Sequence, residues 1–321
     1  AHRIPHNQLE TTERDMNRLL VTGATGFLGA HAVRLAGDHF EVHATGRRPQ
    51  ERCPEGARFH PCDLLRPGAA EALVRAVRPT HLLHLAWTVN PGTVWTSPEN
   101  HLWGAASRRL LLAFARDGGR RAVLAGTCAE YDWGAADVCR EFGTPLRPHT
   151  TYGRTKLELA RWADTFARAR GVSAAAARLF FLYGPGEHPG RLVPSVARAL
   201  LGGEPAPCTA GTQERDFLYV TDAAAALVAL VRSDLTGPVN VGSGRAVAVR
   251  AVVERVAELC GRPDLVRFGA RPLTGTEPPR LVADIARLRD ALGWRPRVDL
   301  ASGLESAVDW WKGLRNSARA A

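Results

Sequence analysis

The stretch TTYGRTKLELAR contains two side chains that could exchange a proton with a substrate, Tyr152 and Lys156. Their spacing of four positions, at the start of an expected helix, puts both on one face. A free tyrosine has a pKa of about 10, and a neighbouring ammonium favours the phenolate and lowers that pKa. A tyrosine tuned in this way can exchange a proton with a carbinol or carbonyl oxygen while a hydride moves to or from a nicotinamide.

Lys156 is unusual in the composition of this chain. Of the 42 lysines and arginines only two are lysines, Lys156 and Lys312. A compact, flexible ammonium can bond a ribose hydroxyl where a planar guanidinium does not easily replace it. The alternative is a surface lysine beside an ordinary tyrosine, because this spacing also arises by chance. Thr127, at the end of the preceding predicted strand, supplies a hydroxyl that could bond the same substrate oxygen.

A glycine-rich turn near the start of the chain predicts a dinucleotide site. LLVTGATGFLGAH has glycines directly after a predicted strand and directly before a predicted helix. Such glycines allow a tight turn, let backbone N–H groups approach a diphosphate, and permit close helix–strand packing. The partial positive charge at the helix N-terminus favours the anion. The predicted cofactor contacts of this turn are Gly23, Thr25, Gly26, Phe27, Leu28 and Gly29.

The end of the second predicted strand indicates which dinucleotide binds. NAD-binding sheets usually have an acidic residue there for the ribose 2′-hydroxyl, but FEVHATGRRP has Gly46 followed by Arg47 and Arg48. Because an arginine fork can bind a 2′-phosphate, we expect NADP(H) to be favoured, with NAD(H) as the alternative cofactor. Two solvated arginines are the alternative explanation. Asp63, at the end of the third predicted strand, is expected near the adenine ring.

Short apolar runs alternate with helical patterns over the first half of the chain. The runs predict strands at 18–23, 40–46, 57–64, 80–87, 120–127 and 173–184. The helical patterns lie at 27–37, 67–79, 107–119 and 156–171. Strict alternation implies parallel pairing, with helices on both faces of the sheet. The expected fold is α/β, a doubly wound parallel Rossmann-type sheet with a smaller mixed C-terminal substrate domain.

Glycine and proline become frequent after about residue 184, and the regular alternation stops. Residues 16–184 are predicted to form an NADP(H)-binding Rossmann domain, with strands contributed from about 210–245, and residues 185–321 mainly a substrate-binding domain. The site is then expected between them, at the C-terminal ends of the strands. Residues 1–15, which precede the only methionine, are polar and non-periodic, so we expect a disordered segment or an artificial extension.

Composition and charge argue against several classes of function. The net charge of +10 comes from scattered arginines, whereas a nucleic-acid-binding protein clusters its basic residues on one helix or stripe. No apolar run approaches the roughly 20 residues that span a bilayer, and no N-terminal stretch has the pattern of a secretory signal. The six cysteines lack the spacing of zinc ligands. We therefore expect a cytoplasmic protein with reduced thiols and without a metal, a nucleic-acid partner or membrane contact.

Seven motifs occur in an order typical of one enzyme family: TGATGFLG, HLLHLA, YGRTK, RLFFLYGPG, RDFLYVTD, NVGSG and LGWRPR. From Arg18 to Trp311 the chain resembles the extended short-chain dehydrogenases/reductases, the NAD(P)-dependent sugar-nucleotide epimerase/dehydratase family. The resemblance implies a nucleoside diphosphate sugar as the substrate and a homodimer formed through the helices after the fourth and fifth strands. It also implies that Thr127, Tyr152 and Lys156 are catalytic.

The resemblance extends to binding residues. Arg215 in RDFLYVTD matches an arginine that usually binds the substrate diphosphate, and Arg271 is a candidate for a second one, with surface charge as the alternative for both. The expected substrate contacts are Trp87, Cys128, Phe181, Arg191, Arg215 and Arg271. Beyond the glycine turn, the expected cofactor contacts are Arg47, Arg48, Asp63, Leu64, Leu85, Ala86, Trp87, Tyr152, Lys156 and Phe180.

Departures from the family pattern narrow the chemistry. Family dehydratases follow the catalytic threonine with Asp-Glu. This chain has Cys128 and Ala129 there, so dehydration is not expected unless Glu130 is rotated into the role. Phe181 replaces an asparagine that usually contacts a phosphate. The loop after the fourth strand is rich in tryptophan, whose rings stack on sugars or bases, pack internally or form a dimer contact. These tryptophans are Trp87, Trp95 and Trp103.

The preferred hypothesis is an NADPH-dependent 4-ketoreductase of a nucleoside diphosphate 4-keto-6-deoxysugar. Tyr152 would protonate the developing alkoxide, Thr127 would stabilise it, and Lys156 would hold the ribose. The first alternative is a nucleoside diphosphate sugar 4-epimerase with tightly bound NAD, which needs the same three residues. A reductase of a non-sugar carbonyl would not need Arg215 and Arg271, and a non-catalytic dinucleotide sensor would not need the catalytic residues.

Overall fold

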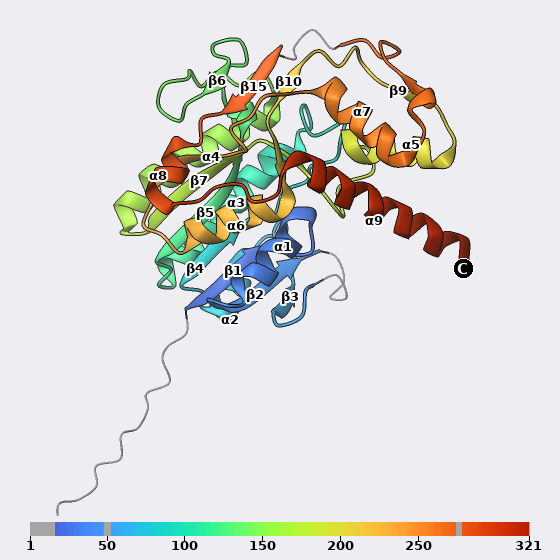
Figure 1. Cartoon of the computed structure of the whole chain (residues 1–321). Helices are drawn as coiled ribbons and strands as arrows, with labels where there is room; N and C mark the ends of the chain where they lie inside the picture. Colours follow the sequence, from blue (N-terminus) through green and yellow to red (C-terminus); the bar gives the residue numbers. More distant parts are fainter. Residues whose placement is uncertain (1–16, 48–52, 274–277, 321) are drawn as a thin grey trace, which may run out of the picture.

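The computed structural model describes residues 17–47, 53–273 and 278–320 of the chain (Figure 1). Two expectations fall outside these residues, the extension at 1–15 and the cofactor contact at Arg48.

A seven-stranded sheet forms the centre of the N-terminal part, in the order β12-β7-β5-β4-β1-β2-β3. All neighbouring strands in it are parallel. Its strands are β1 (Arg18–Thr22), β2 (Glu41–Gly46), β3 (Arg58–Pro61), β4 (His81–His84), β5 (Arg121–Thr127), β7 (Ser173–Leu179) and β12 (Gly237–Val241). Six of them lie on the six predicted apolar runs, and β12 adds the seventh at the edge. The strands are mostly apolar because both faces of the sheet are covered.

Helices cover both faces of this sheet, and each face has its own hydrophobic core. One face is covered by α1 (Phe27–Ala36), α6 (Val220–Val231) and α8 (Ala286–Leu292). The other is covered by α2 (Ala69–Val77), α3 (Glu99–Arg116) and α4 (Thr151–Arg170). Leu19 and Val21 of β1 belong to the first core and Leu20 to the second. Alternate residues of the strand thus point to opposite faces, as its two-residue period requires.

α3 begins at Glu99, earlier than the helical pattern from Ser107 predicted. Pro98 is its N-cap, with φ −64° and ψ −19°. A proline is tolerated at the start of a helix because the first N–H groups have no partner within the helix. The prediction that the loop after the fourth strand extends to Trp103 was therefore wrong from Glu99 onward. Trp103 is a buried residue of the helix.

The strand order places the site. The chain passes from β1 to β2 and β3 on one side, and then returns to form β4 on the other side of β1. At such a reversal the loops that follow the two central strands diverge and leave a crevice at their carboxyl ends. The glycine turn follows β1, and the tryptophan-rich loop follows β4.

The C-terminal part contains three helices around a separate core: α5 (Leu192–Gly202), α7 (Val249–Cys260) and α9 (Leu300–Ala320). A four-stranded sheet has the order β13 (Val247–Ala248), β10 (Glu214–Arg215), β15 (Arg280–Ala283), β6 (Val138–Cys139). Two strand pairs join β8 (Phe181–Tyr183) to β11 (Phe217–Tyr219), and β9 (Ala206–Pro207) to β14 (Val266–Arg267). The short 3₁₀ helices are η2 (Cys128–Glu130) and η3 (Pro263–Leu265). In Figure 1, α5, α7 and β9 lie at the top and β1, β2 and β3 at the bottom. The domain boundary near residue 184 stays a prediction.

Candidate active site

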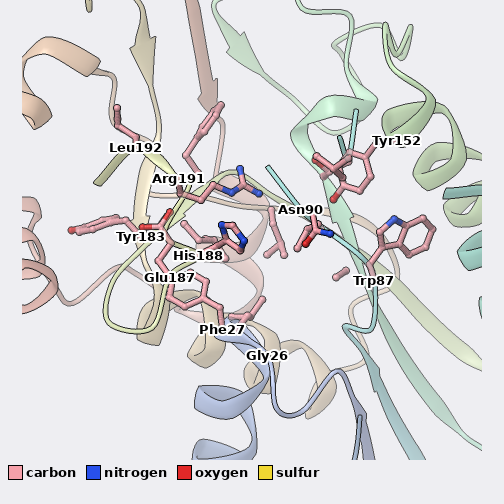
Figure 2. Close-up of a pocket in the computed structure, with 18 of the residues that line it drawn as sticks. Gly26, Phe27, Trp87, Asn90, Tyr152, Tyr183, Glu187, His188, Arg191 and Leu192 are labelled. Carbon is pink, nitrogen blue, oxygen red and sulfur yellow. The ribbon is translucent and has the colours of Figure 1, made fainter. Parts of the chain in front are cut away.

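A cavity of about 1360 Å³ opens at the carboxyl ends of the parallel strands. Its wall consists of the glycine turn, the loops after β2, β4 and β5, the start of α4, and residues between 179 and 196, together with parts of the C-terminal region. Figure 2 shows the glycine turn at Gly26 and Phe27 below, with Trp87 and Tyr152 to one side. A cavity of this size at a reversal of strand order is where an open α/β sheet usually binds its ligand.

Two glycines of the turn, Gly23 and Gly29, leave no room for a side chain. Gly23 has a φ of 69°, and a Cβ there would lie 2.9 Å from the backbone nitrogen of Ala86. A Cβ at Gly29 would overlap the carbonyl oxygen of Gly23. α1 therefore starts directly against the turn, with Gly26 as its N-cap, and its first, unpaired N–H groups are available to an anion. This cradle fits the diphosphate of a dinucleotide.

A buried hydrogen-bond chain holds the loop after β4 against this turn. The Thr22 hydroxyl oxygen accepts from Leu85 N at 3.1 Å and Ala86 N at 3.2 Å, and lies 2.7 Å from His84 Nδ1. The hydroxyl therefore donates to Nδ1, and Nε2 of His84 donates to Ser107 Oγ at 2.7 Å. Burial lowers the pKa of His84 to about 3, so the ring is neutral. The loop is thus fixed by backbone and neutral side-chain groups.

The end of β2 carries the side chain expected to select the dinucleotide. Gly46 is its last residue, and a Cβ there would lie 2.8 Å from the Thr25 hydroxyl oxygen. Arg47 lines the cavity, donates from Nη2 to Thr88 Oγ1 at 3.3 Å, and has its guanidinium carbon 5.5 Å from the centroid of the Trp103 ring. The guanidinium thus turns across the crevice toward the loop and helix that follow β4.

Asp63 is the one described cofactor candidate that does not line the cavity. Its Oδ1 accepts a hydrogen bond from Leu65 N at 3.1 Å and so caps the turn after β3. Its neighbours Cys62 and Leu64 do line the cavity. A contact between Asp63 and an adenine ring stays a prediction.

Thr127 ends β5 and begins η2, and a capping box fixes its backbone. Its hydroxyl oxygen accepts from Ala129 N at 3.2 Å, and its own N–H donates to Glu130 Oε1 at 3.0 Å. Glu130 is fully buried, and its Oε2 accepts from Arg178 Nε at 2.8 Å. Both carboxylate oxygens are therefore engaged away from the cavity. The structure does not rotate Glu130 into the acid–base role considered for dehydration.

α4 presents Tyr152 to the cavity from its first turn. Thr150 caps the helix, and its hydroxyl oxygen accepts from Gly153 N at 3.0 Å. A Cβ at Gly153 would overlap the carbonyl oxygen of Ala129, so glycine allows the helix to start directly on η2. This close packing places Tyr152 beside Thr127, with a hydrogen bond between the two side chains.

The pKa of Tyr152 differs from the sequence-based expectation. Burial raises this pKa to about 12, although the hydrogen bond to Thr127 and the charge of Arg191 lower it. The Lys156 ammonium, 5.9 Å from the centroid of the tyrosine ring, does not reverse the shift. The expected lowering was therefore wrong for the protein alone, because burial outweighs the neighbouring charges. Tyr152 is a neutral phenol at pH 7 and can donate a proton.

Lys156 lies one turn further along α4 and is only 5% exposed. Its Nζ donates to the carbonyl oxygen of Ala125 at 2.8 Å and lies 3.7 Å from the centroid of the Trp87 ring. Burial lowers the pKa of Lys156 to about 7, and the negative charge of Glu130 opposes this shift. The lysine is therefore close to the balance between its charged and neutral forms at neutral pH.

Phe181 and Arg215 lie together in the cavity wall. The guanidinium carbon of Arg215 is 5.6 Å from the centroid of the Phe181 ring. Its Nη1 donates to the carbonyl oxygens of Glu214 and Pro278, both at 2.8 Å. Phe181 thus presents a ring to this arginine, where the family pattern has an amide. Arg271, whose side chain is exposed, lines the same cavity.

The segment between β8 and α5 contributes polar groups that the sequence analysis missed. Arg191, the N-cap of α5, was expected at the site, but His188 and Glu187 of the same segment were not. Asn90, from the loop after β4, was missed as well. Figure 2 shows His188, Asn90 and Arg191 converging in the middle of the cavity. These residues lie in loops rich in glycine and proline, which have no periodicity to indicate where a side chain points.

Glu187 is the most unusual of these groups. It is 7% exposed, and within the described residues its Oε2 is a buried oxygen without a hydrogen-bond partner. Burial raises the pKa of Glu187 to about 8, while the charge of Arg191 and the Gly184 N–H lower it. The carboxyl group is therefore mostly protonated at pH 7 and can donate a hydrogen bond into the cavity it lines.

In the part of the chain that the structure describes, no cluster of three or more His, Cys, Asp or Glu side chains could hold a metal ion. Among those same residues, none of the helices combines the length and apolar character needed to cross a bilayer.

Most residues proposed from the sequence come together in this one cavity. Those in its wall are Gly23, Thr25, Gly26, Phe27, Leu28, Gly29, Arg47, Leu64, Leu85, Ala86, Trp87, Thr127, Cys128, Tyr152, Lys156, Phe180, Phe181, Arg191, Arg215 and Arg271. The individual binding and catalytic roles of these residues stay predictions.

Comparison with known proteins places the chain in a family. Residues 19–242 match the NAD dependent epimerase/dehydratase family. The chain belongs to this family. It is an NAD(P)-dependent enzyme of the extended short-chain dehydrogenase/reductase type, with the Rossmann-like fold that the sequence predicted.

Three relatives indicate the range of the family. UDP-glucuronic acid decarboxylase 1 of Xenopus tropicalis is 28% identical over 94% of this chain and 73% of its own. The UDP-glucose 4-epimerase of Thermus thermophilus, in complex with NAD, is 29% identical with a TM-score of 0.81, covering 92% of this chain and 99% of that one. MoeE5, in complex with UDP-glucose and NAD, is 32% identical with a TM-score of 0.79, and the match covers 93% of this chain and 100% of MoeE5.

These relatives change the balance between the two dinucleotides. Both solved structures are complexes with NAD, so the expected preference for NADP(H) has no support from them and NAD is favoured. That preference rested on the missing carboxylate at Gly46 and on Arg47 and Arg48. Of these two arginines the structure describes Arg47, which is engaged with Thr88 and faces the Trp103 ring. An arginine after β2 that is occupied by protein groups is a weaker argument for a 2′-phosphate than a free one.

Proposed function

We propose that this enzyme is a nucleoside diphosphate sugar 4-epimerase that retains NAD. The observation that carries the proposal is the grouping of Thr127, Tyr152 and Lys156 in the cavity wall, with the nearby carboxylate of Glu130 engaged on both oxygens. Such a set supports reversible proton-coupled hydride transfer. The likeness to UDP-glucose 4-epimerase and to MoeE5 supports the same conclusion.

NAD, when bound, would take the hydride from the sugar C4 and return it to the other face, and its nicotinamide would bring a positive charge to the site. Tyr152 holds the proton that leaves and re-enters at the sugar O4. The Thr127 hydroxyl, which hydrogen-bonds the Tyr152 phenol in the protein alone, would turn its single O–H donor toward that oxygen when the sugar is bound. Lys156 supplies the positive charge that favours the phenolate when the proton has to be accepted.

The arginines of the wall support an anionic substrate. Arg191, Arg215 and Arg271 all line the cavity, and guanidinium groups bind phosphate oxygens in pairs. A non-sugar carbonyl substrate has no phosphate oxygens for these guanidinium groups to bind. A diphosphate held by them would place the sugar toward Tyr152, on the far side from the nucleotide base.

Elimination of water is not part of the proposal. Cys128 and Ala129 offer no carboxylate, and burial raises the pKa of the Cys128 thiol well above its ordinary value. Glu130 is bonded on both oxygens. The second candidate is the NADPH-dependent 4-ketoreductase, which one observation favours: Gly46 ends β2 where an NAD-binding sheet usually has a carboxylate, and Arg47 follows it in the cavity wall.

The test begins with the purified protein and the nucleotide that it releases on denaturation, which we expect to be NAD. UDP-glucose and UDP-glucuronic acid are then supplied, and products are followed by proton NMR. We expect the C4 epimer to form while absorbance at 340 nm stays constant. In a parallel reaction with NADPH and a nucleoside diphosphate 4-keto-6-deoxysugar, consumption of one NADPH for each product would establish the reductase instead. Release of carbon dioxide from UDP-glucuronic acid would establish a decarboxylase.

A homodimer through α3 and α4 is a further part of this proposal. Leu102 and Leu112 of α3 are 58% and 45% exposed, and the rings of Trp162 and Phe166 stack on α4 at 4.8 Å. Exposed apolar side chains on a helix favour a protein contact. Light scattering after size exclusion should give twice the 34.7 kDa of one chain, and Leu102→Arg should yield monomers.

A further inference from the structure

The surroundings of Lys156 are unusual for a buried ammonium. Within the described residues no carboxylate forms an ion pair with it, although it is 5% exposed. Its one hydrogen bond runs to the carbonyl oxygen of Ala125 on β5. A buried ammonium without a counter-ion tends to lose its proton. Another group must therefore favour the charged form if the lysine is to act as a cation.

The titratable groups that face Lys156 do not supply that charge by direct contact. Glu130 of η2 is bonded to Arg178 and acts on Lys156 only through space. His84 of β4 is neutral, and Tyr152 on α4 itself is a neutral phenol. β5 offers only a carbonyl oxygen.

The indole ring of Trp87 is placed to favour the charged form of Lys156. Its ring centroid lies 3.7 Å from Lys156 Nζ, which puts the ammonium in van der Waals contact with the ring face. Indole has the most electron-rich face of the aromatic side chains and attracts a desolvated cation strongly. The same ring meets Tyr152 edge-on, with centroids 6.3 Å apart at 74°. One indole thus contacts both groups that handle the proton.

The structure holds Trp87 in this orientation from behind. Trp87 Nε1 donates to Asn100 Oδ1 at 2.8 Å. Asn100 is 2% exposed, and its amide donates to the carbonyl oxygens of Val94 at 2.7 Å and Ser97 at 2.8 Å. Trp103 stacks on Trp87 with centroids 6.2 Å apart. A buried, fully bonded asparagine fixes the plane of the indole, because any rotation would leave polar groups unpaired.

We propose that Trp87 is a positioning residue that keeps the Lys156 ammonium charged and directed into the active site. The consequence for turnover rests on the proposed function, but the electrostatic role does not. The geometry also explains the choice of lysine, since a compact ammonium can lie over a ring and bond a carbonyl at once, whereas a broad guanidinium would need more donors satisfied.

The chain offers a direct test because Lys156 and Lys312 are its only lysines. In protein labelled with carbon-13 and nitrogen-15 lysine, NMR titration without nucleotide or sugar gives two side-chain signals. Lys312, whose side chain is 41% exposed and pairs with Asp309 at 3.0 Å, is the internal reference. Fluorinated tryptophan keeps the shape of the ring but weakens its negative face. We expect it to lower the pKa of Lys156 by about one unit and to leave Lys312 unchanged.

Two variants separate this effect from a change in packing. Trp87→Phe should lower the pKa of Lys156, and fluorinated tryptophan should then cause no further fall. Trp162→Phe, the same substitution on α4 against Phe166, should leave the pKa of Lys156 as it is. An unchanged pKa in the fluorinated protein, or an equal response in the Trp87→Phe variant, would overturn the proposal. Absence of epimerase activity would instead count only against the proposed function.

Discussion

Two buried basic side chains, Arg178 and Lys156, are both influenced by Glu130, and their surroundings differ. Arg178 on β7 has the Glu130 carboxylate at 2.8 Å, the Tyr131 hydroxyl at 3.1 Å and the Glu141 carbonyl oxygen at 3.2 Å. Lys156 on α4 has one carbonyl oxygen and the face of one ring. Arg178 has three hydrogen-bond acceptors from the protein. Lys156 has one acceptor and faces the cavity.

The difference indicates which region serves stability and which serves chemistry. The Arg178 network continues through Tyr131 to Asn240, whose amide donates to the Cys139 and Asp284 carbonyl oxygens. It joins β5, β7, β12 and the small sheet, so its cost of desolvation is offset by hydrogen bonds on every side. Lys156 keeps donor capacity free for a ligand. A group that must change partners during a reaction cannot be saturated by the protein.

Lys156→Met should produce the largest change, and with opposite signs in activity and stability. Turnover should fall by about 10²-fold or more, because proton transfer through Tyr152 loses its supporting charge. Stability should rise. The folded-state pKa of about 7 lies below the ordinary value of 10.5, so the wild-type protein loses stability as the pH falls from about 10.5 toward 7. Thermal melts should therefore show a gain that is larger at pH 7 than at pH 10; a destabilised variant would contradict the comparison.

Arg178→Met should have the next largest effect, on folding. It leaves the fully buried carboxylate of Glu130 without its partner, and breaking a buried pair in this way costs about 3–5 kcal/mol. Urea unfolding should show the loss, and the double variant with Glu130→Gln should recover part of it. Full stability of the single variant would remove the distinction between the two cations.

Glu187→Gln should have a smaller, pH-dependent effect. The folded-state pKa of about 8 lies above the ordinary value of 4.5, so the contribution of Glu187 to stability is fully present below about pH 4.5 and is lost as the pH rises through 8. Glutamine removes this dependence. We expect the free energy of unfolding to rise by about 1 kcal/mol at pH 9, seen as a higher melting temperature, and to stay unchanged at pH 5. Dinucleotide affinity at pH 9 should also improve, since a carboxylate facing the cavity would repel the diphosphate.

Lys312→Met should have the smallest effect of these substitutions on stability and turnover. This lysine is partly exposed and pairs with Asp309 one turn away on α9. Surface pairs of this kind contribute less than about 1 kcal/mol. Urea unfolding and turnover should both stay near wild type. A large effect would show that the second lysine is also functional, which nothing in the structure indicates.

The sequence predicted most of the frame because its signals are local. Apolar runs marked six strands of the main sheet, and the glycine turn marked the start of α1. The start of α3 was missed, because SPEN has the composition of a turn and only packing against α2 and α4 shows that it continues as a helix. His188, Glu187 and Asn90 were missed for a similar reason, since irregular loops carry no periodic signal.

By itself, the sequence determined the parallel sheet, the dinucleotide turn and the identity of Thr127, Tyr152 and Lys156 as candidates, because spacing along a strand or helix sets which side chains share a face. The tertiary structure alone decided how those groups are tuned. It turned Glu130 away onto Arg178, raised the pKa of Tyr152 by burial, and laid Lys156 on the ring of Trp87. Burial and the approach of residues distant in the chain set the local electrostatics, and neither can be read from spacing.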